Sequence, residues 1–259
     1  LPGGIPSHDT LERVFAKIDP RAFTRFCLEW LRAAADLVGV GHIAIDGKTL
    51  CGSASSTLGP LHLVSAWATH AHLVLGEVAV DGKSNEITAI PKLLELLDLQ
   101  GALVTIDAIG CQKAIAAKIV AKGGAYVLAV KGNQEHLQAD IQTTVGKALE
   151  GELPRHQVAT ITTTDQGHGR QEQRTYTVVT NLKNIRDRAA WPKLKVVGMC
   201  CRERTVNGQQ TVEAHYFGSS QESVGRNCVF CSPLRHCDSA ISRLFSDMGL
   251  PQSRCFFDP

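Results

Sequence analysis

Two aspartates follow short apolar runs in the same manner, and together they could hold a metal ion. Asp46 comes directly after Ile43–Ile45, and Asp107 comes directly after Val104–Ile106. Each run is typical of a buried strand, so each carboxylate is expected where a strand ends and the chain turns. Two close carboxylates repel each other unless a hard cation such as Mg²⁺ lies between them, and such ions promote phosphoryl transfer. The alternative is that each aspartate only caps a turn.

Basic residues near these positions are candidates for binding phosphate groups. Lys48, Lys113 and Lys131 lie close in sequence to the expected strand ends, where each could hold a phosphate as a point charge. His168 and Arg170 belong to a Gly-His-Gly-Arg turn that could reach phosphate from a hairpin. For the lysines a solvated surface position is the alternative interpretation, and for the other two it is a polar turn.

The nine cysteines indicate neither a disulfide framework nor a clear zinc site. Disulfide frameworks are typical of small secreted domains, and no secretory signal opens this chain. The segment Cys228–Cys237 holds three cysteines and a histidine, but their spacing does not form two zinc-binding pairs. Cys51 and Cys111 lie near the aspartates, where buried or incidental thiols are the simpler interpretation.

Composition and charge permit a nucleic-acid partner without requiring one. The net charge is +2 and the pI is near 8.1, which is far from the strongly basic balance of an obligate nucleic-acid binder. No apolar run approaches the length of a membrane span, so we expect no membrane association. Because the first residue is Leu1, we expect an N-terminally incomplete chain.

The spacing of apolar residues predicts the elements that would position the aspartates. We expect a helical pair from Ser7, followed by strands at His42–Ile45, Leu61–Thr69, Leu73–Val80, Ala102–Ile106 and Tyr126–Val130, with helices from Glu86 and at Gln112–Lys122 and Gln134–Leu149. This order of elements is typical of a mixed sheet covered by helices, an α/β fold. It resembles the RNase H-like fold, in which the first and fourth strands are adjacent and parallel. That resemblance implies that Asp46 and Asp107 meet.

Beyond Pro154 the chain becomes rich in Thr and Val, which indicates further strands. They are expected at Val158–Thr164, Gln173–Thr180, Leu194–Arg204 and Thr211–Phe217, with Asn207-Gly208 as a hairpin turn. We therefore predict an N-terminal helical segment at 1–38, an RNase H-like core at 39–150, a β-rich insertion at 151–218 and a poorly assigned tail at 219–259.

Several blocks of sequence carry a family resemblance. They are Gly4–Thr10, Ile45–Leu50, Leu61–Ser65, Lys83–Pro91, Thr105–Ala108, Gly110–Lys113 and Leu128–Gln134. In this order they resemble the ISAs-type, H-repeat-associated DDE transposases of bacterial insertion sequences. The resemblance implies DNA cleavage and strand transfer with Mg²⁺ or Mn²⁺, and makes Asp46 and Asp107 the first two members of the metal-binding triad. It also implies DNA as partner, a homodimer in the transposition complex, and a place in the bacterial cytoplasm at the nucleoid.

The sequence also departs from that family. Cys51 stands where the family usually carries Arg, and nothing after Phe217 matches the helix that bears the third carboxylate. Glu222 and Asp238 are candidates for it only by default. A tail read in a shifted frame from about Ser219 would explain both its composition and the lost motif. An inactive DNA-binding remnant and an RNase H-like nuclease that does not transpose therefore stay open as alternatives.

Overall fold

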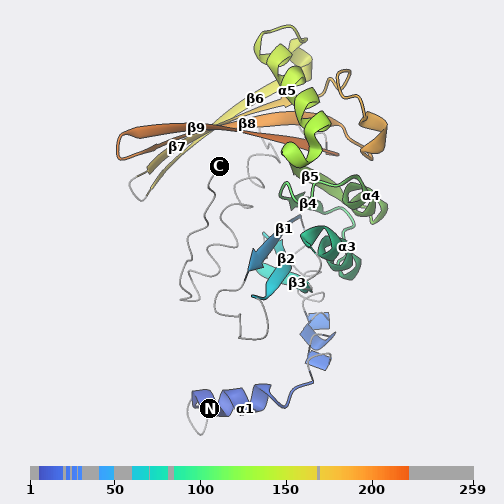
Figure 1. The fold of residues 1–259 in the computed structure, drawn as a ribbon, viewed down its shortest axis with the longest axis vertical. Helices are drawn as coiled ribbons and strands as arrows, with labels where there is room; N and C mark the ends of the chain where they lie inside the picture. The colour runs from blue at the N-terminus through green and yellow to red at the C-terminus, as the bar shows by residue number, and fades with distance from the viewer. Residues whose placement is uncertain are drawn as a thin grey trace. The chain divides into compact units, whose positions relative to one another are not determined.

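The computed structural model describes residues 6–19, 22–23, 25–27, 29–30, 41–49, 60–69, 71–80, 85–167 and 170–221. The chain divides into two units, Leu1–Gly39 and Val40–Pro259, which are described separately below (Figure 1). Within these described ranges, no helix is both long enough and apolar enough to cross a membrane.

The first unit is helical where it is described. Helix α1 spans His8–Phe15, and Ser7 stands at its N-cap, where its hydroxyl oxygen accepts a hydrogen bond from the Thr10 N–H at 3.4 Å. Such a bond satisfies one of the backbone donors that a helix leaves unpaired at its start. The backbone is helical again at 22–23, 25–27 and 29–30. The predicted helical N-terminal segment is therefore confirmed in these residues.

The second unit is built on one nine-stranded sheet with the order β3-β2-β1-β4-β5-β9-β8-β7-β6. The strands are β1 (His42–Thr49), β2 (His62–Ala68), β3 (Leu73–Val80), β4 (Leu103–Ile106), β5 (Ala125–Val130), β6 (Val158–Gly167), β7 (Arg170–Val179), β8 (Val196–Val206) and β9 (Gln209–Ser219). β1, β4 and β5 are parallel neighbours, and β2 and β3 form an antiparallel meander beside β1. This is the mixed sheet of an RNase H-like fold, as predicted.

Helices α3 (Glu86–Leu96), α4 (Lys113–Ala121) and α5 (Glu135–Leu149) pack against this sheet, and short 3₁₀ turns lie at Gly132–Gln134, Arg155–Gln157 and Arg188–Ala190. α3 contacts β2 and β3, α4 contacts β5, and α5 contacts β7, β8 and β9. Each helix buries residues spaced three or four apart, such as Ile90, Leu93 and Leu94 of α3. The four residues of β4 are all buried, as a parallel strand in the middle of a sheet requires.

The first strand is longer than the sequence indicated. A strand ending at Ile45 was expected, but β1 continues to Thr49 because β2 provides backbone partners for it as far as His62. Its parallel partner β4 ends at Ile106, opposite Ile45. Asp46 therefore lies inside β1, at the point where the parallel pairing stops, and the prediction that it follows the end of its strand was wrong.

The four Thr-rich strands continue the same sheet. β9 pairs antiparallel with β5, with Ser219 opposite Val127, and β8, β7 and β6 follow outward as long ribbons coloured yellow to orange in Figure 1. Asn207 and Gly208 form the turn between β8 and β9, both with positive φ, as a two-residue hairpin of this kind requires. The predicted hairpin is confirmed, whereas the domain boundaries at 38, 150 and 218 stay a prediction.

Two glycines provide a matched test of this packing. A Cβ at Gly198 in β8 would lie 2.6 Å from the Phe217 ring and 2.6 Å from the Thr177 carbonyl oxygen, whereas a Cβ at Gly146 in α5 would meet nothing within 4 Å. We expect Gly198→Ala to lower the free energy of unfolding by about 1 to 3 kcal/mol through overpacking. Gly146→Ala should raise it by roughly 0.5 to 1 kcal/mol, because alanine favours the helix. Denaturant unfolding of the full chain measures both, and effects of the same sign would contradict the packing described.

Candidate metal centre

The two aspartates lie at the same end of the sheet, where the parallel pairing of β1 and β4 stops. Ile45 of β1 is paired with Ile106 of β4, and Asp46 and Asp107 are the next residue on each strand. Neighbouring strands in a sheet are less than 5 Å apart, so this register brings the two carboxylates side by side. The structure thus joins two residues that are 61 positions apart in sequence, counted as 107 minus 46.

Both carboxylates are held in an environment that opposes their charge. Burial raises the pKa of Asp46 to about 6, with further increases from Asp107 and Glu86, while Lys48 lowers it. Burial likewise raises the pKa of Asp107; the Gly110 N–H, 3.4 Å from its Oδ1, acts in the opposite sense. Desolvated acids of like charge become easier to ionise when a cation binds between them.

Glu86 is a third acidic residue at this edge, and the sequence analysis missed it. It is the first residue of α3, its side chain is only 13% exposed, and its Oε1 lies 2.6 Å from His62 Nε2. A Cβ built on Gly47 would fall 2.2 Å from the same Oε1, so the Glu86 carboxylate lies over Gly47, on the face of β1 opposite to that of the Asp46 side chain. In the sequence Glu86 marked only the start of a helix. A glycine inside a strand was the signal that another group lies close to the backbone.

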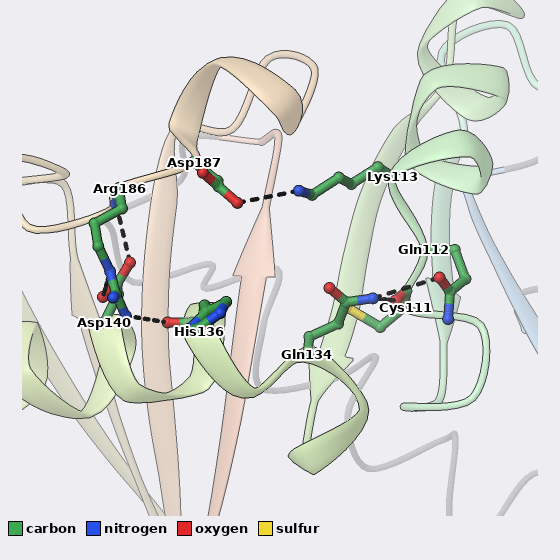
Figure 2. Close-up of polar contacts among 8 residues, drawn as sticks. All are labelled: Cys111, Gln112, Lys113, Gln134, His136, Asp140, Arg186 and Asp187. Carbon is green, nitrogen blue, oxygen red and sulfur yellow. Dashed lines mark hydrogen bonds and ion pairs between the residues drawn. The ribbon is translucent and has the colours of Figure 1, made fainter.

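The loop after β4, which carries Asp107, is held by the loop after β5. The Asn133 side-chain amide donates to the Ala108 carbonyl oxygen at 2.6 Å, and the Gln134 amide donates to the Cys111 carbonyl oxygen at 3.0 Å. Figure 2 shows Gln134 reaching Cys111 in this way. The Gly132-Asn133 turn thus borders the site and braces the backbone beside Asp107.

The predicted phosphate-binding residues are distributed unequally around the aspartates. Lys48 and Lys131 act electrostatically on Asp46 and Asp107 respectively. Lys113 instead extends to Asp187, with 3.2 Å between Nζ and Oδ2 (Figure 2). His168 lies outside the described residues, and of Arg170 only the backbone, at the start of β7, is described. Contact of these five residues with phosphate stays a prediction.

A cavity of about 300 Å³ lies beside Lys113, between the start of α5 and the segment before η3 (Arg188–Ala190). Asp140 on its wall accepts hydrogen bonds from the Arg186 backbone N–H at 2.9 Å and from Arg186 Nε at 2.8 Å (Figure 2). These bonds fasten the connection between β7 and β8 onto α5. The cavity wall therefore has a structural role in joining the outer strands to the core.

The thiols do not contribute chemistry among the described residues of the site. Cys111 is buried, and burial raises the pKa of its thiol to about 12, so it stays protonated at neutral pH. A protonated thiol is neither a strong nucleophile nor a good metal ligand. Cys51, the segment Cys228–Cys237, and the default candidates Glu222 and Asp238 lie outside the described residues.

The two aspartates match a hard divalent cation in ligand type; among the described residues, only His8, Asp9 and Glu12 bring three ligand atoms within 4.8 Å of one another. Asp46, Asp107 and Glu86 offer only carboxylate oxygens, which Mg²⁺ and Mn²⁺ prefer, and the Cys111 thiol next to them is protonated. The metal-binding role of the aspartates stays a prediction, and the burial and mutual repulsion of these acids agree with it.

Comparisons with known proteins place the chain among mobile-element proteins. The family profile described as the transposase DDE domain matches residues 41–211. The chain is 42% identical over 224 residues to an uncharacterized protein in the dhlA 3′ region of Xanthobacter autotrophicus, an alignment that covers 85% of this chain and 74% of that protein. It is 39% identical over 213 residues to YhhI of Escherichia coli strain K12, named as an H repeat-associated candidate transposase, with 81% of this chain and 56% of that protein covered.

A further relative and one solved structure also match the chain. YncI of Escherichia coli O157:H7, named as a candidate transposase, is 43% identical over 182 residues, covering 68% of this chain and 45% of that protein. The chain thus spans between 45% and 74% of the length of these relatives. A solved piggyBac transposase synaptic complex with hairpin DNA aligns with a TM-score of 0.41 at 8% identity over 84% of this chain and 42% of that chain.

Because burial opposes the charge of both aspartates, we expect that neutralising one of them stabilises the fold of the metal-free chain. Because the pKa of Asp46 rises from 3.8 to about 6 on folding, the folded chain binds this proton more tightly, and the group destabilises the fold as pH rises through that window. We expect Asp46→Asn to raise the free energy of unfolding in EDTA by about 1 to 2 kcal/mol at pH 8. The gain should vanish near pH 4, where the carboxyl is protonated. Denaturant unfolding at both pH values tests this, and an equal gain at both would contradict it.

Proposed function

The chain belongs to the transposase DDE-domain family, and from that premise we propose that it cleaves DNA at the ends of an insertion sequence and transfers the strand to a target. Members of this family use a divalent metal. We assign Mg²⁺, with Mn²⁺ as a substitute, to Asp46 and Asp107 of this chain. The observation that supports the proposal most strongly is the register of β1 and β4, which sets these two carboxylates next to each other.

The proposed reaction has two steps. In the first, a water oxygen forms a bond to a phosphorus atom at the element's end, the bond from that phosphorus to the 3′ oxygen breaks, and a 3′ hydroxyl and a 5′ phosphate remain. In the second, the freed 3′ oxygen attacks a target phosphodiester and displaces the target's own 3′ oxygen. A bound divalent ion supplies charge neutralisation at the phosphate and lowers the pKa of the attacking hydroxyl.

In this proposal the residues of the chain hold the ion and orient its ligands. Asp46 and Asp107 would hold the ion through oxygen ligands at the edge of a rigid sheet, where β1 and β4 fix their separation. The Asn133 side chain secures the backbone next to Asp107 and so limits the movement of its carboxylate. Positioning of this kind lowers the entropic part of the barrier to phosphoryl transfer.

DNA is the proposed partner, and the basic residues around the aspartates are its proposed contacts. Lys48 and Lys131 lie within electrostatic reach of the two carboxylates, so a phosphate that approaches the ion would also meet these two cations. Lys113, His168 and Arg170 are proposed to contact the DNA backbone further out. A homodimer, with one chain at each end of the element, completes the proposal.

One observation on the sequence favours a second candidate function, DNA binding without cleavage. The family's third carboxylate has no recognisable counterpart after Phe217. A chain that lacks this carboxylate, and has no other acid in its place, would bind DNA without cutting it. That inactive remnant and the active transposase differ in a single measurable outcome, the metal-dependent breakage of DNA.

The nicking assay that separates them uses the full chain, Mg²⁺ and DNA carrying the element's terminal repeats. We expect strand breakage that Asp46→Asn and Asp107→Asn each reduce to the level seen with EDTA, because each removes an ion ligand. Asp98→Asn is the matched control, since Asp98 lies before β4, at the opposite edge of the sheet, and is exposed. DNA binding without breakage would support the remnant instead. Strand-transfer products would exclude a nuclease that does not transpose.

Salt-dependent DNA binding tests the role of Lys131 separately from catalysis. Each lysine that neutralises a phosphate adds about 0.9 to the slope of log affinity against log salt concentration. We expect Lys131→Ala to weaken binding to all sequences alike and to reduce that slope by about 1. Lys147→Ala, in the last turn of α5, serves as the control and should leave the slope unchanged. An unchanged slope for Lys131→Ala would remove this residue from the DNA interface.

A further inference from the structure

We propose that the outer edge of β6 is the surface through which two copies of this chain pair, as antiparallel strands centred on Thr162. The inference rests on the proposed function and deepens it, because that function includes a homodimer without assigning a surface to it. In the described part of the chain β6 is the last strand of the sheet, with β7 as its only neighbouring strand. Three properties of this edge support the pairing: the direction of its backbone groups, its lack of protection, and its self-complementary sequence.

The direction of the backbone groups follows from one hydrogen bond at the start of β6. The Thr180 N–H donates to the Gln157 carbonyl oxygen at 3.0 Å, in line with the register that sets Val158 opposite Val179. In an antiparallel pair such bonds recur at every second residue, so the odd-numbered residues of β6 bond to β7. The even-numbered residues therefore direct their N–H and C=O groups away from β7, at Val158, Thr160, Thr162, Thr164 and Gln166. β6 thus presents a continuous row of donors and acceptors to a further strand.

The edge carries few of the features that keep edge strands from pairing. Such features are lysines, prolines, bulges and covering elements. β6 contains no lysine and no proline, its ten pairs with β7 run without a register shift, and its only charged residue is Asp165. The opposite edge differs, because the pairing of β2 with β3 shifts register between Ala66 and Trp67, and α3 packs against β3. Among the described residues, β6 is therefore the edge that is open to a partner strand.

The sequence of β6 is compatible with a second copy of itself. A two-fold axis at Thr162 sets this residue opposite its own copy and Thr160 opposite Thr164. All three threonines are exposed, and their outward donors then meet the outward acceptors of the other strand. In the same register Asp165 faces Ala159 of the second copy, so the single charge of the strand does not oppose itself. Backbone bonding and charge thus favour the same register.

Sedimentation of the full chain, without DNA or metal, tests the pairing. We expect a mass of two chains at micromolar concentration, and we expect Thr162→Pro to raise the dissociation constant of the dimer about tenfold or more, because it removes a donor from both copies. The Thr162 N–H points away from β7, so a proline there leaves the ladder with β7 intact. Thr162→Val is the matched control, since it keeps the N–H and the branched shape, and its dissociation constant should stay within about threefold of the wild type. A monomeric wild type, or a dimer that Thr162→Pro does not weaken, would overturn the inference.

An oxidative cross-link tests the register without the proline variant. Opposed residues of a hydrogen-bonded antiparallel pair have Cα atoms about 5.5 Å apart, a distance that a disulfide can bridge. We expect Thr162→Cys to give a disulfide-linked dimer beyond the wild-type level, whereas Thr160→Cys should give one only when it is mixed with Thr164→Cys. The same yield from Thr160→Cys alone as from Thr162→Cys, or no cross-link from either, would contradict the pairing.

The two assays are independent of DNA cleavage, so they separate this inference from the proposed function. Asp46→Asn should dimerise as the wild type does, because Asp46 lies in β1 and not at the β6 edge. A chain that pairs through β6 but does not break DNA would contradict the proposed cleavage alone. A chain that breaks DNA but does not pair through β6 would contradict this inference alone.

Discussion

The parallel pairing of β1 with β4 is the constraint on which the site depends. Because Ile45 stands opposite Ile106, two acids that repel each other must follow at adjacent positions. The buried residues of β4, together with α3 and α4, supply the apolar burial that keeps this unfavourable arrangement in place. The stability of the apolar core thus offsets the destabilising effect of the two buried aspartates, as is common at functional sites.

The sequence predicts the elements well where one period dominates. Continuous apolar runs identified β4 and β5, helical spacing identified α3 and α5, and Asn207-Gly208 identified a hairpin turn that the structure contains. The succession of elements predicted a mixed sheet, and the adjacency of β1 and β4 was what the resemblance to the RNase H-like fold implied. The fold class could thus be predicted from the sequence, and the meeting of the two aspartates from the resemblance.

What the sequence could not predict depends on contacts between distant residues. The extension of β1 to Thr49 requires β2 as a partner, and nothing in Asp46-Gly47-Lys48 reveals that partner. Glu86 reads as an ordinary first residue of a helix until α3 is docked beside Gly47. The pairing of Lys113 with Asp187 joins α4 to a segment that no local pattern connects with it. In each case tertiary packing, and not local propensity, decides the outcome.

The end of β9 has a consequence for the geometry of any additional ligand. The Tyr126 N–H donates to Ser220 Oγ at 2.9 Å, and Ser219 pairs with Val127, so the described chain leaves the sheet beside the first residues of β5. The aspartates lie at the other end of the parallel strands. The two ends of β5 are about 20 Å apart, because the strand has six residues that each rise 3.3 Å. A helix rises 1.5 Å per residue and needs roughly 13 residues to span that distance. An acid from beyond Gln221 that joins the aspartates would therefore have to be carried across that distance.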